Sequence, residues 1–400
     1  MDPIILHDWS AFAIRWLHVV TAIAWIGSSF YFIALDLGLN RDIEGPADGE
    51  EWQVHGGGFY HIQKYLVAPE AMPEHLTWFK WESYATWLSG FAMLVLVYYL
   101  GADLYLVDPN VADISIPFAI AISLASLAFG WIVYDQLCKS PLGETPTVLM
   151  LLLFVLLVVM AWGYTQVFSG RAALLHLGAF TATIMTANVF LIIIPNQKIV
   201  VADLKAGRTP DAKYGKIAKL RSTHNNYLTL PVVFLMLSNH YPLAFASRYN
   251  WLIAALVFLM GVTIRHFFNT RHARKAWPWW TWGVTVALFL AWLAVQILRL
   301  ALAFLRFLAG DRTAIHRYFD RTRERRGYQA LAEGMLAVAS GEGRLAQDHA
   351  KRAARYLDQP HLTNLLAAQA AGKTGQPVVK PQPADLDPAT PGADMIRAAE

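Results

Sequence analysis

Eight runs of about 20 mostly apolar residues dominate the sequence, and this is the length that a helix needs to cross a hydrocarbon core of roughly 30 Å. A backbone in lipid can satisfy its N–H and C=O groups only internally, so each run is predicted to be helical. A hydrophobic share of 56% and a charged share of 16% fit the same class. We therefore predict an all-α polytopic membrane helix bundle with eight transmembrane helices, at residues 11–35, 83–102, 116–137, 147–168, 171–195, 225–243, 249–268 and 279–307.

Several kinds of protein and site are excluded at this stage. The first run lacks a short basic segment before it and a small-residue cleavage site after it, so we interpret it as a retained helix in a lipid bilayer. A single cysteine, Cys138, excludes a disulfide framework within the chain. The sequence has no CxxCH motif and therefore no covalent c-type haem. The net charge of +4 is small, and we expect no nucleic-acid partner.

The basic residues in the loops predict the orientation. Loops after the odd-numbered runs carry fourteen lysines and arginines, whereas loops after the even-numbered runs carry two, Arg171 and Arg248. The positive-inside rule then puts the odd-numbered loops in the cytoplasm and both chain ends outside. Seven basic residues between 306 and 326 favour the opposite side for the C-terminal flank. The two charge signals disagree.

The chain divides into parts of different character. Residues 1–305 form the predicted membrane domain. Residues 310–374 are alanine-rich and amphipathic, with a glycine-containing turn, which predicts a short helical hairpin of tetratricopeptide (TPR) type. Residues 375–400 are rich in Pro, Ala and Asp and are predicted to be a disordered tail.

Histidines inside the predicted helices suggest a redox cofactor. His18 and His176 both lie roughly 8–10 Å below the outer boundary at 1.5 Å per residue, and His224 and His266 share the inner level. Two neutral imidazoles at one depth on different helices suit a six-coordinate haem iron. We predict haem b with these four histidines as iron ligands, and Arg15 as a partner for a propionate. Alternatively, such histidines bond only to backbone or lipid headgroups, and Arg15 extends to the interface.

Two polar segments near the inner face are candidate substrate sites. The loop over 55–90 interleaves His61 and His75 with aromatic residues, a mixture that suits a flat polar heterocycle, although an interfacial aromatic belt has the same composition. The stretch RSTHNNYLTLP opens the sixth run with Arg221, His224, Asn225 and Asn226. We expect these four residues to converge on an inner-facing pocket. In the alternative interpretation, Thr223 caps the helix and the asparagines lie in its first turn.

Long blocks of the sequence resemble the PuuD-type membrane urate hydroxylases. They are RWLHVVTAIAWIGSSFYFIALD, GGGFYHIQKYLVAPEAMPEHLTWFKWESYATWLSGF, ANVFLIIIPNQKIVVADLKAGRTPD, RSTHNNYLTLPVVFLMLSNHYP and RHFFNTRH with WWTWGV, and they cover roughly residues 1–285. The resemblance implies oxidation of urate to 5-hydroxyisourate in a bacterial inner (plasma) membrane, with electrons passed to cytochrome c. In that family a periplasmic cytochrome c domain follows the last transmembrane helix.

The C-terminal part departs from that pattern. The segment from about 286 onward, with LRLALAFLRFLAGDRTAIHRYFDRTRERRGYQALAEGMLAV, resembles HemY-type, haem-biosynthesis-associated membrane proteins with tetratricopeptide repeats. A junction inside the eighth run accounts for the conflicting charge signals. The chain therefore lacks a cytochrome c domain of its own, and an external cytochrome c is the expected electron acceptor.

The leading hypothesis is a membrane-bound urate dehydrogenase whose candidate catalytic residues are His61, His75, Arg221, His224, Asn225 and Asn226. A neutral histidine takes a proton from urate, while Arg15 or Arg221 and the asparagines hold its carbonyl and imide edges. Two rival classes stay open at this stage. One is a transporter for a purine or another organic anion, for which the halves show no internal inverted repeat, and the other is a cytochrome b electron carrier.

Overall fold

The computed structural model describes residues 3–65, 73–247, 249–308, 314–357 and 359–374. The predicted disordered tail at 375–400 and the loop residue Arg248 lie outside the described residues. The chain forms two compact units, residues 1–294 and 295–400.

The first unit is a bundle of long helices, and each of the eight predicted runs falls on one of them. These are α1 (Pro3–Gly38), α2 (Trp81–Leu94), α4 (Ile116–Lys139), α5 (Pro146–Val167), α6 (Gly170–Ala187), α8 (Ala212–Ser238), α10 (Asn250–His272) and α11 (Trp280–Leu308), which continues into the second unit. A π-helical segment, η1 (Val95–Tyr99), extends α2, and another, η3 (Asn188–Ile193), joins α6 to α7 (Ile194–Lys205). The short helices α3 (Ala102–Tyr105), η2 (Pro141–Glu144) and α9 (Pro242–Phe245) lie in connections.

Six of the described helices are long and apolar enough to cross a membrane: α1, α4, α5, α6 with its continuation through α7, α10 and α11. This confirms a helical membrane protein. The other two predicted runs lie on α2 and α8. The α2 helix has only 14 residues before it passes into η1, and α8 carries charged and amide side chains in its first half.

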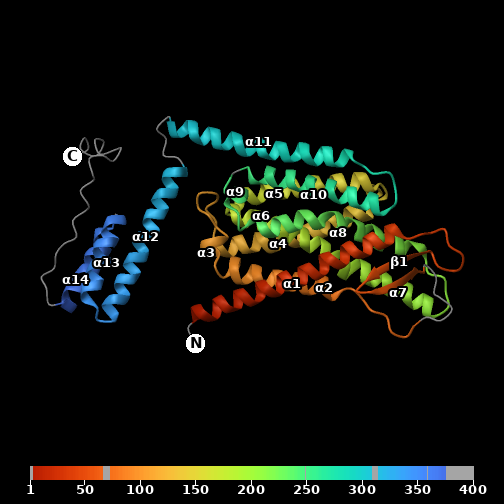
Figure 1. Ribbon diagram of the computed structural model, residues 1–400, viewed down its shortest axis with the longest axis horizontal. Helices are drawn as coiled ribbons and strands as arrows, with labels where there is room; N and C mark the ends of the chain where they lie inside the picture. Colours follow the sequence, from red (N-terminus) through yellow and green to blue (C-terminus); the bar gives the residue numbers. More distant parts are fainter. Residues whose placement is uncertain (1–2, 66–72, 248, 309–313, 358, 375–400) are drawn as a thin grey trace. The chain divides into compact units, whose positions relative to one another are not determined.

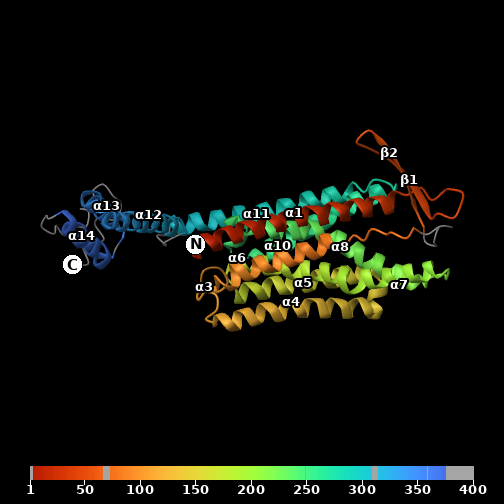
Figure 2. The ribbon, with the colours of Figure 1, turned by 90° about the horizontal axis from the view of Figure 1, so that it is seen from below.

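The helices of the first unit run side by side (Figure 1; Figure 2), with the chain reversing at the two ends of the bundle. The α1 helix packs on α2, and α8 packs on α6, η3 and α10. Pro231 inside α8 lies against Gly261 of α10, where an added Cβ would be 2.8 Å from Pro231 Cδ. The small residue therefore lets α8 and α10 approach closely.

The fold is nearly all-α, as predicted, and the loop after α1 adds one β-hairpin. Strands β1 (Gly49–His55) and β2 (Gly58–Lys64) pair antiparallel. Gly56 and Gly57, at φ 58° and 81°, form the two-residue turn, a conformation that glycine adopts without strain. Asp36 at the end of α1 bonds both Lys64 of β2 and Lys219 of α8, so it ties the hairpin to the bundle.

The second unit contains α12 (Ala314–Ala339), α13 (Gly343–Tyr356) and α14 (Pro360–Thr374). The predicted helical hairpin corresponds to α12 and α13, which turn at Gly341 with φ 82°. The α14 helix adds a third layer, and the small core consists of alanines and leucines such as Ala330, Ala353 and Leu366.

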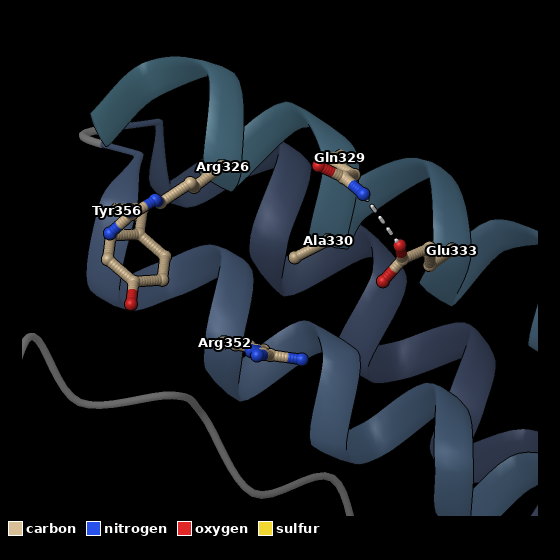
Figure 3. Close-up of a pocket in the computed structure, with 6 residues that line it drawn as sticks. All are labelled: Arg326, Gln329, Ala330, Glu333, Arg352 and Tyr356. Atoms are coloured by element: carbon tan, nitrogen blue, oxygen red, sulfur yellow. Dashed lines mark hydrogen bonds between the residues drawn. The ribbon is translucent and has the colours of Figure 1, made fainter. Parts of the chain in front are cut away.

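A hollow of about 230 Å³ opens between α12 and α13 (Figure 3). It is lined by Arg326, Gln329, Ala330, Glu333, Arg352 and Tyr356. Gln329 donates to Glu333 at 3.1 Å across its rim. The volume is below the range that is usual for small-molecule sites.

Candidate functional site

The α8 helix carries the largest concentration of polar side chains in the bundle. Arg221, His224, Asn225 and Asn226 are all buried. The helix begins at Ala212, and Asp211 is its N-cap, with its carboxylate accepting from Lys213 N–H at 2.9 Å. That hydrogen bond lowers the pKa of Asp211. Thr223 therefore lies inside the helix, and the alternative in which it caps the helix is wrong.

Arg221 is the centre of a closed polar network. Its Nη2 donates to Asp135 Oδ1 of α4 at 2.7 Å, and its Nη1 donates to Asn188 Oδ1 of η3 at 3.1 Å. Asn188 Nδ2 in turn donates to Asn225 Oδ1 at 2.9 Å. Asp135 has a second cation, Lys139, at 2.6 Å. We call these five residues the Arg221 network, and its buried charge is fully paired.

His224 extends the Arg221 network through a tyrosine. Tyr134 Oη lies 2.8 Å from His224 Nδ1 and accepts from Asn188 Nδ2 at 3.2 Å. Because Oη already accepts there, its O–H is free to donate to Nδ1, which leaves the ring proton of neutral His224 on Nε2. Nε2 is buried and has no partner among the described residues. His224 thus presents an unused hydrogen-bond donor inside the bundle.

Asn226 belongs to a different network on the α10 side of α8. Its Oδ1 accepts from Arg265 Nη2 at 3.2 Å and from Asn269 Nδ2 at 2.9 Å. The four polar residues of α8 therefore do not converge on one pocket, which corrects that prediction. Successive residues of an α-helix are rotated by about 100° about the helix axis, so the side chains of His224 and Asn226 are about 200° apart around α8.

The inner histidines have separate partners. His266 Nδ1 lies 2.9 Å from Tyr227 Oη, and its ring packs against Trp280 at a centroid distance of 5.8 Å. His224, by contrast, faces Tyr134 on α4. The structure thus places the two rings of the predicted inner pair in different surroundings.

The outer histidines are both held through Nδ1. His18 Nδ1 lies 3.0 Å from Thr86 O of α2, and His176 Nδ1 lies 2.8 Å from Ala172 O. A carbonyl oxygen only accepts, so Nδ1 carries the proton and Nε2 keeps its lone pair in both rings. Metal-bound histidines are usually oriented in this way by their second nitrogen.

The donor chemistry of the outer pair therefore fits an iron ligand, although His176 Nε2 also has Ser123 Oγ at 2.8 Å. The α2 helix packs on both α1 and α6, and no contact between the His18 and His176 rings occurs among the described residues. No group of three or more His, Cys, Asp or Glu side chains in the described part of the chain could hold a metal ion. A haem iron needs only two protein ligands, so the haem prediction stays a prediction.

The remaining predicted residues lie away from α8. His61 on β2 is stacked on Trp52 at 4.2 Å and lies 2.7 Å from Glu50 Oε2. Hydrogen bonding from His61 lowers the pKa of Glu50. His75 and Arg15 are exposed. None of these three residues joins the Arg221 network or the network of Arg265.

A hollow of about 520 Å³ lies where α1, β1 and α10 meet. Its lining includes Gly38, Glu51, Phe268, Arg271 and His272. Glu51 Oε2 is buried there without a hydrogen-bond partner among the described residues. The size falls within the range of small-molecule sites.

Sequence reasoning did not single out Tyr134, Asp135, Arg265 and Asn269. Asp135 and Arg265 nevertheless carry a recognisable signal, because each is a charged residue inside a predicted membrane run. The tyrosine and the asparagine carry none, since both residue types are common near helix ends in membranes.

Comparison with known proteins gives two matches. A family model described as urate oxidase N-terminal matches residues 4–296. A second, described as HemY protein N-terminus, matches residues 276–375. Both confirm the resemblances inferred from the sequence, and the two matches overlap within α11 and the residues just before it. No curated protein and no solved structure matches the chain significantly.

Proposed function

Because the chain belongs to the urate oxidase N-terminal family, we propose that it oxidises urate to 5-hydroxyisourate within the membrane. The reaction adds the oxygen of one water to the purine and releases two electrons and two protons. The observation that carries the location is the burial of Arg221, His224, Asn225 and Asn226 on a single helix of the bundle. Polar groups inside a membrane bundle are costly and mark functional sites.

The α8 residues supply binding and orientation. On the α10 side of α8, Asn226 Nδ2 is a buried donor without a partner among the described residues, and it is suited to a urate carbonyl oxygen. His224 lies on the α4 side, and it takes up a proton only if its own ring proton shifts to Nδ1 and the O–H of Tyr134 turns away. The Arg221 network fixes Tyr134 and so fixes His224.

We further propose that haem b takes the electrons, with His18 and His176 as ligands and Arg15 near a propionate. When bound, this group would supply one-electron transfer. The role of the protein is to hold both rings by Nδ1 so that Nε2 stays unprotonated. For His224 to join His266 as a second pair, its ring proton would have to shift from Nε2 to Nδ1.

The proposed electron acceptor is an external cytochrome c, and the proposed location is a bacterial inner membrane with α8 entering from the cytoplasmic side. This location follows from the basic residues in the odd-numbered loops. The residues of this sequence contain no CxxCH motif, which supports the proposal of a separate acceptor.

The test uses purified full-length protein in detergent with urate and added oxidised cytochrome c. Urate consumption coupled to cytochrome c reduction is expected, and Asn226→Leu should lower the rate by about 10²-fold or more, the scale of a lost positioned donor. Asn110→Leu is the matched control because Asn110 is exposed. No urate-dependent reduction by the wild type would exclude the proposal.

The same preparation separates the rival functions. A Soret band that responds to dithionite but not to urate indicates a cytochrome b carrier. Urate uptake into proteoliposomes without oxidation indicates a transporter. His18→Ala and His176→Ala should each remove haem, and an unchanged haem content in both variants excludes the outer pair as ligands.

A further inference from the structure

Arg265 on α10 is a buried cation with no carboxylate within ion-pair distance in the described part of the chain. It is 6% exposed. Its Nη2 donates only to neutral amide oxygens, Asn269 Oδ1 at 2.9 Å and Asn226 Oδ1 at 3.2 Å. Its Cζ lies 4.0 Å from the centroid of the Phe30 ring. A buried charge is expensive to keep unless an opposite charge joins it.

Arg221 shows what a structural arginine looks like in the same bundle. It is equally buried, but Asp135 lies 2.7 Å away and neutralises it. Arg221 extends from α8 toward α4 and η3, whereas Arg265 of α10 lies on the other side of α8. Only the one on the α10 side lacks a counter-ion, so burial alone does not explain Arg265.

The amide of Asn226 points to the same conclusion. Its Oδ1 accepts from both Arg265 and Asn269, and turning the amide over would set its N–H donors against theirs. The orientation is therefore fixed by the network. Nδ2 is then a fully buried donor with no partner among the described residues. An unused buried donor beside an unpaired cation calls for an anionic acceptor.

The surroundings suit a flat ligand. The Phe30 ring offers an apolar face. The hollow of about 520 Å³ lies further along α10, where Phe268, Arg271 and His272, three to seven residues beyond Arg265, line it, but Arg265, Asn226 and Phe30 do not. Glu51 on its wall is an acceptor for ligand N–H groups.

We propose that Arg265, Asn226 and Asn269 form the anion-binding site for the substrate, and that the ligand is a planar heterocyclic anion. This rests on the proposed function, in which that anion is urate, a planar monoanion at neutral pH. The guanidinium binds the anionic edge, Asn226 Nδ2 donates to a carbonyl oxygen, and Phe30 stacks on the ring. Arginine is suited to this because its fork matches two adjacent acceptors.

The experiment measures equilibrium binding of labelled urate to the full-length protein in detergent, without electron acceptor. Arg265→Gln should weaken urate binding about 100-fold, as expected for loss of one partner of a desolvated charged hydrogen bond. Arg265→Lys keeps the positive charge but loses the paired N–H donors of the guanidinium, and it should weaken urate binding about 10-fold. Arg208→Gln removes an exposed arginine from an inner loop and should change nothing.

A second measurement distinguishes a binding role from a structural one. Without ligand, Arg265→Gln should melt at the same temperature as the wild type or higher, because it removes an unpaired buried charge. Urate should raise the melting temperature of the wild type and not that of Arg265→Gln. Unchanged urate affinity in Arg265→Gln and Arg265→Lys would overturn the inference while leaving the proposed function intact. If Arg265→Gln does not fold, Arg265→Lys alone decides.

A second probe separates the inference from the proposed function. Orotate, a planar pyrimidine carboxylate, is titrated in parallel. Suppose that the wild type does not bind urate but binds orotate, and that the Arg265 variants bind orotate more weakly. This result would overturn the urate function and support the anion site. A wild type that binds neither probe would overturn both.

Discussion

The ion pair between Arg221 and Asp135 makes an asymmetric prediction about stability. The side chains of both residues are nearly buried, with 3% and 10% exposed, and their atoms lie 2.7 Å apart. Removing one partner of such a pair leaves the other as an uncompensated buried charge. That generally costs about 3–5 kcal/mol.

The two removals are not equivalent in this protein. Asp135→Asn leaves Arg221 with neutral Asn188 and the rings of Tyr134 and Trp131, and we expect the full cost of about 3–5 kcal/mol. Arg221→Gln leaves Asp135 paired with Lys139 at 2.6 Å. The remaining loss is that of hydrogen bonds, about 1–3 kcal/mol.

The free energy of unfolding of each variant is measured by titration with a denaturing detergent in mixed micelles. The double variant Asp135→Asn/Arg221→Gln should be more stable than the sum of the two single losses, because the pair is removed together. Lys139→Gln is the control, since Lys139 is 58% exposed and should contribute less than about 1 kcal/mol. An Arg221→Gln loss as large as that of Asp135→Asn would refute the reasoning.

Two further predictions concern packing and pH. Gly130→Ala should destabilise the bundle by about 1–3 kcal/mol, because the new Cβ would lie 2.3 Å from Phe180 Cε2. Gly163→Ala is the control, because the space around Gly163 is open. Equal melting temperatures of the two variants would contradict the packing argument. Hydrogen bonding from His61 lowers the pKa of Glu50 in the folded hairpin, so this contact stabilises the hairpin above the unfolded pKa of Glu50 and is lost as the pH falls through the folded value. Amide exchange of the hairpin should therefore accelerate in acid in the wild type but not in Glu50→Gln, and pH-independent exchange in the wild type would contradict it.

The positions of the helices could be predicted from the sequence because lipid leaves an apolar run of this length one choice of secondary structure. The β-hairpin was missed although its signal is present. The glycines at 56 and 57 lie between short segments rich in aromatic and β-branched residues, a pattern typical of a two-residue hairpin turn. The aromatic residues of the same loop also suit a binding surface or an interfacial belt, and this second pattern masks the hairpin signal.

The sequence predicted the level of the candidate residues in the membrane, but not the direction in which their side chains point. Position along an apolar run gives the level of a residue in the membrane, so His18 and His176 could be assigned one level. The rotation of each helix about its axis depends on which neighbours pack around it. For this reason the partner of Arg221, which lies 86 residues away on α4, appeared only in the structure. The separation of Asn226 from His224 follows from the rotation of about 100° per helical residue and could have been predicted.

The contrast between the two buried arginines suggests that the two sides of α8 have different roles, one in stability and one in binding. Arg221 is neutralised by Asp135 and bonded to Asn188, so the interface of α8 with α4 and η3 is complete without a ligand. Arg265 has only amides and an aromatic ring, so the interface of α8 with α10 is the one that a bound anion would complete. Residues that stabilise the bundle and residues that bind the substrate would then occupy opposite sides of one helix. Substitutions on the α4 side should lower stability first and activity as a result, whereas substitutions on the α10 side should lower substrate affinity in a bundle that stays folded.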